Sequence, residues 1–305
     1  MDILKLMKNL QKPEYPVDVV LDTDTYNEID DQYALSYLLS YGEKLHTKAI
    51  YAAPFYNSHS DSPADGMEKS YREILHLLEL MKRDDLKSCV FRGSDRYLPD
   101  EQTPVSSPAA EHLCELAMNY SSEKPLYVIA IGAITNVASA ILLQPEIVDR
   151  IVLVWLGGHA TNWPHTAEFN MKQDVAGARI VFGCGVPLVQ LPCMGVVSAF
   201  TVSEAELLYW LKGKNPLCDY LVQHTIDEVT YAAGKPWSRV LWDVTAVAWL
   251  TGDFTDGITI PSPIPEYDHH YGSDPTRHPI HYVYNIRRDA LVQDLFARLT
   301  GLDAK

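Results

Sequence analysis

Short runs of β-branched and apolar residues alternate with longer helical patterns along this chain of 305 residues, and this alternation constrains the fold more than any other feature. Val17–Leu21, Leu126–Ala130 and Ile151–Trp155 have the composition of buried strands. Met67–Lys82 repeats apolar side chains three and four residues apart, as an amphipathic helix does. The alternation predicts an α/β fold with an open, mostly parallel sheet and helices on both faces, in a single domain over residues 1–305.

The other elements follow the same order, and the last third of the chain is expected to be mostly helical. The further predicted strands are 47–52, 89–91 and 187–191. The further predicted helices are 30–41, 109–120, 134–143, 175–182, 203–211, 217–232, 244–250 and 288–299. An irregular loop is expected at 261–275. In such folds the functional site lies beyond the carboxyl ends of the strands, near the point where the strand order reverses.

A cluster of acidic residues directly follows the first predicted strand, in the segment LDTDTYNEIDDQYAL. Its members are Asp22, Asp24, Glu28, Asp30 and Asp31. Like charges this close repel one another, so the cluster either binds a cation or stays solvated. No Lys or Arg stands nearby in the sequence, and such carboxylates suit a hard cation, Ca²⁺ or Mg²⁺. The alternative interpretation is that the aspartates only cap a helix and shape a turn.

Two other kinds of site also begin with closely spaced aspartates. An EF-hand loop starting at Asp22 would need Gly at its sixth position and Glu at its twelfth, where this chain has Asn27 and Tyr33. A phosphatase of the haloacid-dehalogenase type begins with D-x-D-x-T/V after a strand. Asp22 and Asp24 fit that pattern, but Tyr26 takes the Thr/Val position. The EF-hand is therefore excluded, and the phosphatase stays open as an alternative.

The segment VVLDTDTYNEIDDQYAL resembles the N-terminal signature of the inosine–uridine-preferring nucleoside hydrolase family, a strand followed by D-x-D and then a D-D pair. The family usually has three residues between the second and third Asp, whereas this chain has the five residues Thr25–Ile29 and lacks the family's Pro-Gly. It is therefore similar to a variant branch. The resemblance implies a Rossmann-like fold, Ca²⁺ as cofactor, and hydrolysis of the N-glycosidic bond of ribonucleosides to ribose and free base.

Further segments resemble the family in the same order along nearly the whole chain. IAIGAITNVASAILLQPEIV is similar to its G-x-L-T-N segment, and VLVWLGGHATNWPHTAEFNMKQDVAGARIVF to its G-G … A-E-F-N … D-x-x-A-A segment. VLWDVTAVAWL is similar to its H-D-x-x-A-V-A segment. Taken alone, Thr135-Asn136 would be an ordinary helix start, and Glu168 and Asn170 would be solvated loop residues.

The resemblance implies roles for individual residues. Four oxygen donors would hold the calcium ion: Asp24, Asp31, the carbonyl of Thr135, and Asp243. Asp24 would also be the general base that deprotonates the calcium-bound water. Side chains from several loops would bind the nucleoside, with Asp30 on the ribose 2-hydroxyl. The residues expected to bind it are Asp30, Asn57, Asn162, Glu168, Asn170 and Trp242.

Trp242 is the main departure from the family, because much of the family has His at this position, where it helps the leaving base depart. An indole N–H is too weak an acid to protonate a base, although the ring could stack on one. His159, His165, His269 and His270 lie on predicted loops and could supply a proton, or each could be a surface residue. Trp242 also leaves open a nucleoside-binding protein without catalysis, or a hydrolase for some other N-riboside.

Composition bears on partners and location. There are 25 Lys+Arg against 40 Asp+Glu, a net charge of −15 without a basic cluster, which argues against nucleic acid as a partner. No apolar run predicts a membrane span, and the first residues do not have the pattern of a signal peptide. Five cysteines without a C-x-x-C spacing favour a reducing compartment, so a cytoplasmic protein is expected. The resemblance implies a small-molecule nucleoside partner and a homodimer or homotetramer.

Overall fold

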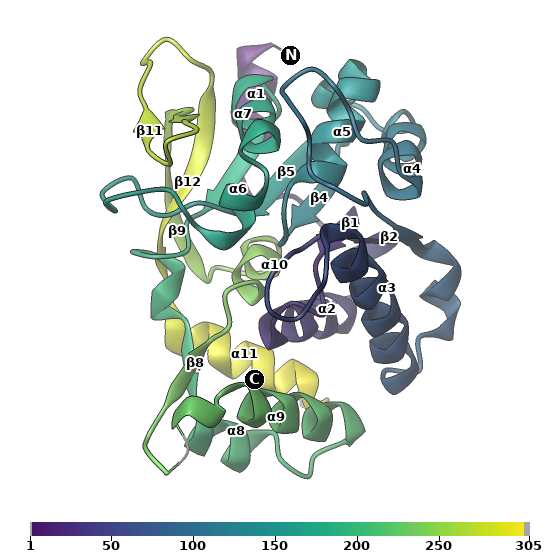
Figure 1. Cartoon of the computed structure of the whole chain (residues 1–305), viewed down its shortest axis with the longest axis vertical. Coiled ribbons are helices and arrows are strands. Elements are labelled where there is room, and N and C mark those ends of the chain that lie inside the picture. The colour runs from purple at the N-terminus through teal and green to yellow at the C-terminus, as the bar shows by residue number, and fades with distance from the viewer. Residues whose placement is uncertain (1, 233, 302–305) are drawn as a thin grey trace.

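The computed structural model describes residues 2–232 and 234–301, and an eight-stranded sheet forms its centre (Figure 1). The strands lie in the order β3-β2-β1-β4-β5-β6-β12-β9, and all neighbours are parallel except β12 and β9. Their bounds are β1 Val17–Thr23, β2 Leu45–Ala52, β3 Val90–Arg92, β4 Leu126–Ala130, β5 Ile151–Leu156, β6 Leu188–Leu191, β9 Thr255–Pro261 and β12 Pro279–Ile286. The predicted fold class, an α/β fold with an open and mostly parallel sheet, is confirmed.

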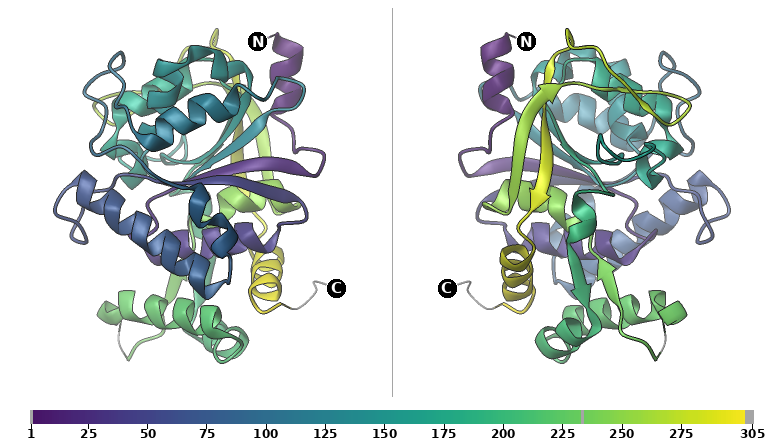
Figure 2. Two further views of the ribbon diagram at one scale, coloured as in Figure 1. Left: turned by 90° about the vertical axis from the view of Figure 1, so that its right-hand side faces the viewer. Right: turned by 90° about the vertical axis from the view of Figure 1, so that its left-hand side faces the viewer.

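Helices cover both faces of the sheet, as the two views of Figure 2 show. Successive side chains of β1 point to opposite faces, so that Val19 and Leu21 pack into one buried cluster and Val20 into another. The first cluster includes α2 Ile29–Ser40, α3 Pro63–Leu80, α9 Pro216–Glu228, α10 Val244–Thr251 and α11 Arg288–Leu299. The second includes α4 Pro108–Ala117, α5 Thr135–Leu143 and α7 Val175–Gly183. Burial on both faces explains why the strand sequences are nearly continuous apolar runs.

The starts of two covering helices follow from local sequence. At α3, the side chain of Ser62 accepts a hydrogen bond from the Asp65 N–H, and Pro63 occupies the first turn. At α4, Ser107 accepts from Ala110 N–H, and Pro108 again follows the cap. A serine cap satisfies an otherwise unpaired N–H, and a proline lacks one, so both favour a helix start. These caps explain why both helices begin before their apolar patterns do.

β1 lies where the strand order reverses, because β2 and β3 extend to one side of it and β4 and the later strands to the other. Asp22, near the end of β1, pairs in register with Tyr51 of β2 and Ala130 of β4. The residues between Thr23 and Ile29 connect β1 to α2. The acidic segment therefore lies at the carboxyl edge of the sheet, at the position where the fold class predicts the site.

The expectation that the last third is mostly helical is wrong, since β9 and β12 add two strands to the sheet there. Asp256, Gly257 and Pro261 are weak strand formers, and β9 tolerates them because it is an edge strand. The predicted loop 261–275 also contains a short antiparallel hairpin, in which the two residues of β10 Ile264–Pro265 pair with the two residues of β11 Tyr271–Gly272. Two short helices were not predicted either, α1 Ile3–Asn9 and α6 Phe169–Gln173.

A smaller unit projects from one end of the molecule, at the bottom of Figures 1 and 2. We call residues 201–232 and 234–240 the helical lobe. It begins with β7 Thr201–Ser203, continues through α8 Glu204–Trp210 and α9, and ends with β8 Ser238–Val240, which pairs with β7. Helix α9 packs against α2 and α3. In the described part of the chain, none of the helices has both the length and the apolar character that a membrane span requires.

Candidate functional site

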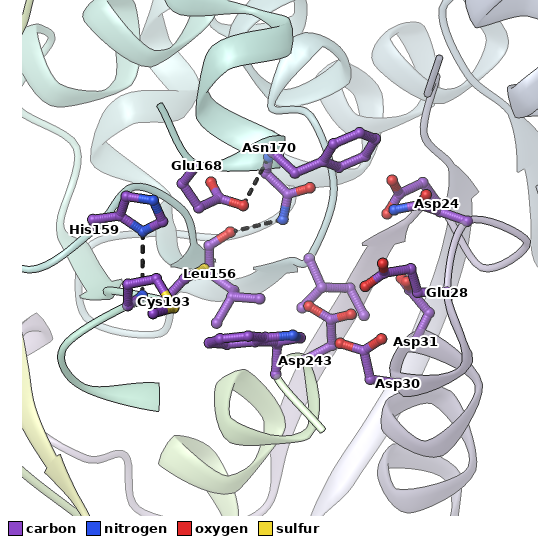
Figure 3. A pocket seen from close by; sticks show the side chains of 15 residues that line it. Asp24, Glu28, Asp30, Asp31, Leu156, His159, Glu168, Asn170, Cys193 and Asp243 are labelled. Atoms are coloured by element: carbon purple, nitrogen blue, oxygen red, sulfur yellow. Dashed lines mark hydrogen bonds between the residues drawn. The ribbon is translucent and has the colours of Figure 1, made fainter. Parts of the chain in front are cut away.

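A pocket lies beside the carboxyl end of β1, and Figure 3 shows the side chains that line it. Acidic side chains gather on one side, which we call the acidic wall: Asp24, Glu28, Asp30, Asp31 and Asp243. Side chains from loops after β5 and β6 and from the start of α6 form the opposite wall: Leu156, His159, Glu168, Asn170 and Cys193. Two segments far apart in the sequence thus meet across one cavity.

The acidic wall is built from two helix starts. Asp30 and Asp31 lie in the first turn of α2, and Asp243 directly precedes α10. Because α2 packs against α10, the two starts come together. Asp30, Asp31 and Asp243 each offer an oxygen that lies within 4.8 Å of the others, and all three are buried. Helix N-termini favour negative charge, which offsets part of the repulsion among the three carboxylates.

The carboxylates of the acidic wall have few hydrogen-bond donors. Thr23 Oγ1 donates to Asp31 Oδ1 at 2.6 Å. In the described part of the chain, neither oxygen of Asp24 has a hydrogen-bond partner, and Asp30 Oδ1 has none. Gly132 makes room for Asp24, since a Cβ there would stand 3.0 Å from Asp24 Oδ1. Buried oxygens without donors are costly, so this wall is suited to a ligand that brings positive charge or donors.

Burial raises the pKa of the aspartates on the acidic wall above the ordinary value. The pKa of Asp30 is raised to about 6 by burial, although the guanidinium of Arg239 counteracts the shift. The pKa values of Asp24, Asp31 and Asp243 are raised well above the usual range, by burial first and then by neighbouring carboxylates. A bound divalent cation would remove both causes, because it replaces the missing solvation and offsets the repulsion.

The atoms available to bind a metal ion fit a hard cation, because all of them are carboxylate oxygens. Of the predicted calcium ligands, Asp31 and Asp243 lie together, and Asp30 joins them. Asp24 lines the same pocket without belonging to that closest set. Thr135 does not line the pocket, and its hydroxyl donates to Asp174 at 2.6 Å. Ligation by Asp24 and by the Thr135 carbonyl therefore stays a prediction.

Asp22 belongs to the acidic cluster in sequence but not to the lining of the pocket. Its Oδ1 accepts a hydrogen bond from Asn136 Nδ2 at 2.8 Å. Asn136 Oδ1 in turn accepts from the N–H and the hydroxyl of Ser94. A Cβ at Gly93 would stand 2.4 Å from Asn136 Nδ2, so that only glycine leaves room for this network. Asp22 thus ties β1 to the start of α5 beneath the pocket.

Two of the predicted nucleoside-binding asparagines lie outside the pocket lining. Asn57 Nδ2 donates to Asn27 Oδ1 at 2.5 Å, and Asn27 is the residue that borders the pocket. Asn162 is exposed on the loop after β5 and lies near Gly195. Asn57 therefore reaches the site only through Asn27, and Asn162 would have to move with its loop to touch a ligand.

Glu168 and Asn170 line the opposite wall as predicted, but the Glu168 carboxylate is already paired. It accepts backbone N–H bonds from Gly158, Asn170 and Met171, at 2.8 to 2.9 Å. The thiol of Cys193 is a further donor to it. A carboxylate has about four acceptor positions, so Glu168 shapes the wall more than it can bind a sugar. Asn170 Nδ2 donates to the Leu156 carbonyl, at 3.1 Å, and its Oδ1 borders the pocket.

Trp242 lines the pocket next to Asp243, and His159 is the one of the four proposed histidines that does so. The Nδ1 of His159 accepts the Met194 N–H at 3.2 Å, so the neutral ring carries its proton on Nε2. Burial, with a smaller contribution from His165, lowers the pKa of His159 to about 4. His159 is therefore a neutral hydrogen-bond donor at pH 7 and not a cationic acid.

Several residues of the site carry no signal in the sequence. Arg239 of β8 contacts Glu28 at 2.9 Å, Glu228 at 3.4 Å and Asp30 at 3.6 Å. No Lys or Arg lies near the acidic cluster in the sequence, but in the structure the helical lobe brings Arg239 to it. Asn27 and Cys193 likewise border the pocket only through the fold. For Asn27, its place within the acidic segment was the one local sign in the sequence that it could belong to the site.

The chain matches the family model described as inosine-uridine preferring nucleoside hydrolase over residues 19–281. A pyrimidine-specific ribonucleoside hydrolase, RihA, of Salmonella paratyphi A is 27% identical over 263 residues, covering 76% of this chain and 78% of that protein. Among solved structures, a plant nucleoside hydrolase, PpNRh1, has a TM-score of 0.76 at 21% identity, over 93% of this chain and 99% of the other. A purine-preferring ribonucleoside hydrolase from Gardnerella vaginalis has a TM-score of 0.72 at 18% identity, over 93% and 98%.

The range that the family model matches includes all the residues of both walls of the pocket, which run from Asp24 to Asp243 in the sequence. The two structures share the fold with this chain. The two named ribonucleoside hydrolases differ in the bases that they prefer, pyrimidine in one and purine in the other.

Proposed function

This chain belongs to the inosine-uridine preferring nucleoside hydrolase family, an enzyme family, and we propose that it cleaves the N-glycosidic bond of ribonucleosides with calcium as cofactor and Asp24 as general base. The observation that carries the proposal is the acidic wall: buried aspartates gather at the point where the strand order reverses, and Asp24 has no hydrogen-bond donor for either oxygen among the described residues. The family match gives no support to a phosphatase or to a nucleoside-binding protein without catalysis.

The residues that would hold calcium are Asp31 and Asp243, with Asp24 and the Thr135 carbonyl, and Asp30 stands close enough to compete. When bound, the ion would supply positive charge that orients a water molecule and lowers its pKa. Asp24 would accept a proton from the water molecule whose oxygen attacks C1′ of the ribose. Neither of its oxygens has a hydrogen-bond donor within residues 2–232 and 234–301, which leaves both available for this transfer.

The ribose would lie between the two walls, since vicinal hydroxyls need acceptors and donors from both sides. Asp30 Oδ1 has no hydrogen-bond donor among the residues that the structure describes and would accept a hydrogen bond from the 2′-hydroxyl. Asn170 borders the pocket opposite and would bind another hydroxyl. Hydroxyl contacts matter because the binding energy of the sugar can be used to reach the oxocarbenium-like transition state.

As the C1′–N bond breaks, its electron pair goes to the leaving base. The ring of Trp242 lines the pocket and would stack on that base. His159 would add a hydrogen bond from Nε2 but no full charge, given its low pKa. The base then takes up its proton from solvent. Trp242→Leu tests the stacking: kcat should fall about fivefold, as loss of an aromatic pair worth about 1 kcal/mol predicts.

The decisive experiment measures free ribose released from a panel of purine and pyrimidine nucleosides, with calcium, with a chelator, and in Asp24→Ala. Asp61→Ala is a matched control, because Asp61 is an exposed carboxylate outside the pocket lining. Calcium-dependent release that is lost in Asp24→Ala and kept in Asp61→Ala would support the proposal. No release from any nucleoside by a folded protein that binds calcium would contradict it.

The panel also settles base preference, which the relatives leave open because they differ in it. Residues 1–305 are proposed to act as one domain. A role in nucleoside salvage, a cytoplasmic location, a homodimer or homotetramer, and the absence of a nucleic-acid partner remain proposals that rest on the resemblance and on the net charge of −15.

A further inference from the structure

Arg239 occupies a position that the proposed reaction does not yet explain. Its Nη2 lies 2.9 Å from Glu28 Oε2, 3.4 Å from Glu228 Oε2 and 3.6 Å from Asp30 Oδ1. These contacts come from three elements: β8 carries Arg239, the start of α2 carries Glu28 and Asp30, and the end of α9 carries Glu228. The side chain of Arg239 is only 17% exposed. One guanidinium thus joins the helical lobe to the acidic wall.

Arg239 is also the only Lys or Arg, within the described residues, that lines the pocket or the cavity next to it. That second cavity shares Glu28 with the pocket and is bordered by His59, His224, Glu228 and Arg239. A single positively charged side chain among several carboxylates determines where their negative charge is compensated. Its planar guanidinium can also hold two carboxylates at once.

Asp30 lies between two possible positive partners. One of its oxygens is within 4.8 Å of oxygens on Asp31 and Asp243, so it could join them around a cation. Its Oδ1 faces Arg239 at 3.6 Å, too long for a direct hydrogen bond, and has no other partner in the described part of the chain. At that distance the guanidinium attracts the carboxylate without occupying its lone pairs. Asp30 Oδ1 therefore stays open to a donor from a ligand.

We propose that Arg239 is a positioning residue that attracts Oδ1 of Asp30 and so reserves this oxygen for the 2′-hydroxyl of the ribose instead of the cation. The inference rests on the proposed function, because it takes the metal and the nucleoside as the ligands of this pocket. Without Arg239, Asp30 turns to the cation beside Asp31 and Asp243, and the enzyme loses its preference for a ribose over a 2′-deoxyribose.

The test compares Arg239→Gln with wild type in two measurements. The first is the ratio of kcat/KM for a ribonucleoside to kcat/KM for its 2′-deoxy counterpart, which should fall about tenfold, as loss of a charge-assisted hydrogen bond predicts. The second is calcium affinity, measured by calorimetry without substrate, which should stay equal or become tighter because a repelling cation is gone and a carboxylate is freed.

Arg288→Gln is the matched control. Arg288 also ties the helical lobe to the rest of the molecule, through the Thr201 carbonyl and Glu206 at 2.6 to 2.9 Å, and it lies outside the pocket lining. It should leave both the ratio and the calcium affinity at wild-type values. A ratio that falls as much in Arg288→Gln would show that loosening the lobe is sufficient, and would overturn the role of Arg239.

Arg239→Lys keeps the charge but cannot hold two carboxylates with one planar group, so its ratio should lie between those of wild type and Arg239→Gln. It also serves if Arg239→Gln does not fold. A folded variant with the wild-type ratio, or one with weakened calcium binding, overturns the proposal. If wild type releases no ribose from any nucleoside, the proposed function fails, while the calorimetric comparison still decides whether Arg239 opposes metal binding by Asp30.

Discussion

Asp24 and Glu168 are both buried carboxylates that line the pocket, one on each wall, and their surroundings differ completely. Glu168 accepts three backbone N–H groups, and those bonds lower its pKa against the raising effect of burial. Asp24 has no hydrogen-bond partner for either oxygen among the described residues, and neighbouring carboxylates raise its pKa further. Burial alone therefore does not separate a structural carboxylate from a reactive one, whereas the supply of donors does.

The difference shows where the protein itself offsets the free-energy cost of burying a carboxylate and where that cost remains. On the opposite wall, helix α6 and Gly158 provide the donors, so the protein itself offsets part of the free-energy cost of burying the Glu168 carboxylate. On the acidic wall, both oxygens of Asp24 and the Oδ1 of Asp30 have no hydrogen-bond donor among the described residues, so the cost of burying them is offset only when a ligand binds. Strain of this kind is typical of active sites, where function and stability compete.

The largest expected effect separates catalysis from stability at the unpaired wall. Asp24→Asn should lower kcat by about 10²–10⁴-fold, the range for loss of a general base. It should also raise the unfolding free energy of the calcium-free protein by about 1–2 kcal/mol, because a buried carboxylate without donors is replaced by an amide. Kinetics and urea unfolding in chelator measure the two. If Asp24→Asn instead lowered the unfolding free energy, Asp24 would stabilise the folded protein as a paired carboxylate does, and the difference from Glu168 would not hold.

Calcium should stabilise the folded protein through the acidic wall and not through the opposite wall. Calcium at about 100 times its Kd should raise the unfolding free energy of wild type by about 2.7 kcal/mol, seen as a rise in Tm. Asp31→Asn, which removes an oxygen from the closest set, should lose most of that rise. Equal stabilisation of the two proteins would show that the ion binds elsewhere.

A smaller effect is expected at the paired wall. Glu168→Gln should lower the unfolding free energy by about 1–3 kcal/mol, because an amide brings N–H groups against the backbone donors of Gly158 and Met171. Calcium affinity should be unchanged, since Glu168 does not belong to the cation set. Thermal unfolding and calorimetry test both parts, and a large fall in calcium affinity would contradict the division between the walls.

The smallest effect concerns pH. Burial lowers the pKa of His159 from 6.5 to about 4, so its contribution to stability is complete above pH 6.5 and is lost as the pH falls toward 4. His159→Gln removes this loss and should therefore be more stable, relative to wild type, at pH 5 than at pH 8. Urea unfolding at both pH values measures the difference, and a pH-independent difference would show that His159 does not titrate this way.

Much of the site was predictable where its residues are adjacent in sequence or lie in a recognisable segment. Seven of the predicted site residues line one pocket, while their individual roles stay predictions: Asp24, Asp30, Asp31, Glu168, Asn170, Trp242 and Asp243. Asn57 and Asn162 do not, because a motif specifies a residue type and not the course of its loop. Strand β9 was missed since its Asp, Gly and Pro residues are acceptable only at the edge of a sheet whose order the sequence does not reveal.

The sequence by itself determined the alternation of strands and helices, and it determined that four aspartates would crowd the end of β1, because neighbours along the chain stay neighbours in space. Only the tertiary structure decided which of these carboxylates have donors. Asp22 accepts a hydrogen bond from Asn136, and Asp30 lies opposite Arg239. Those partners lie on α5 and β8, far along the chain, and the packing of whole helices and of the helical lobe brings them into contact. A carboxylate's role depends on such partners, since burial without them costs free energy that only a ligand can offset.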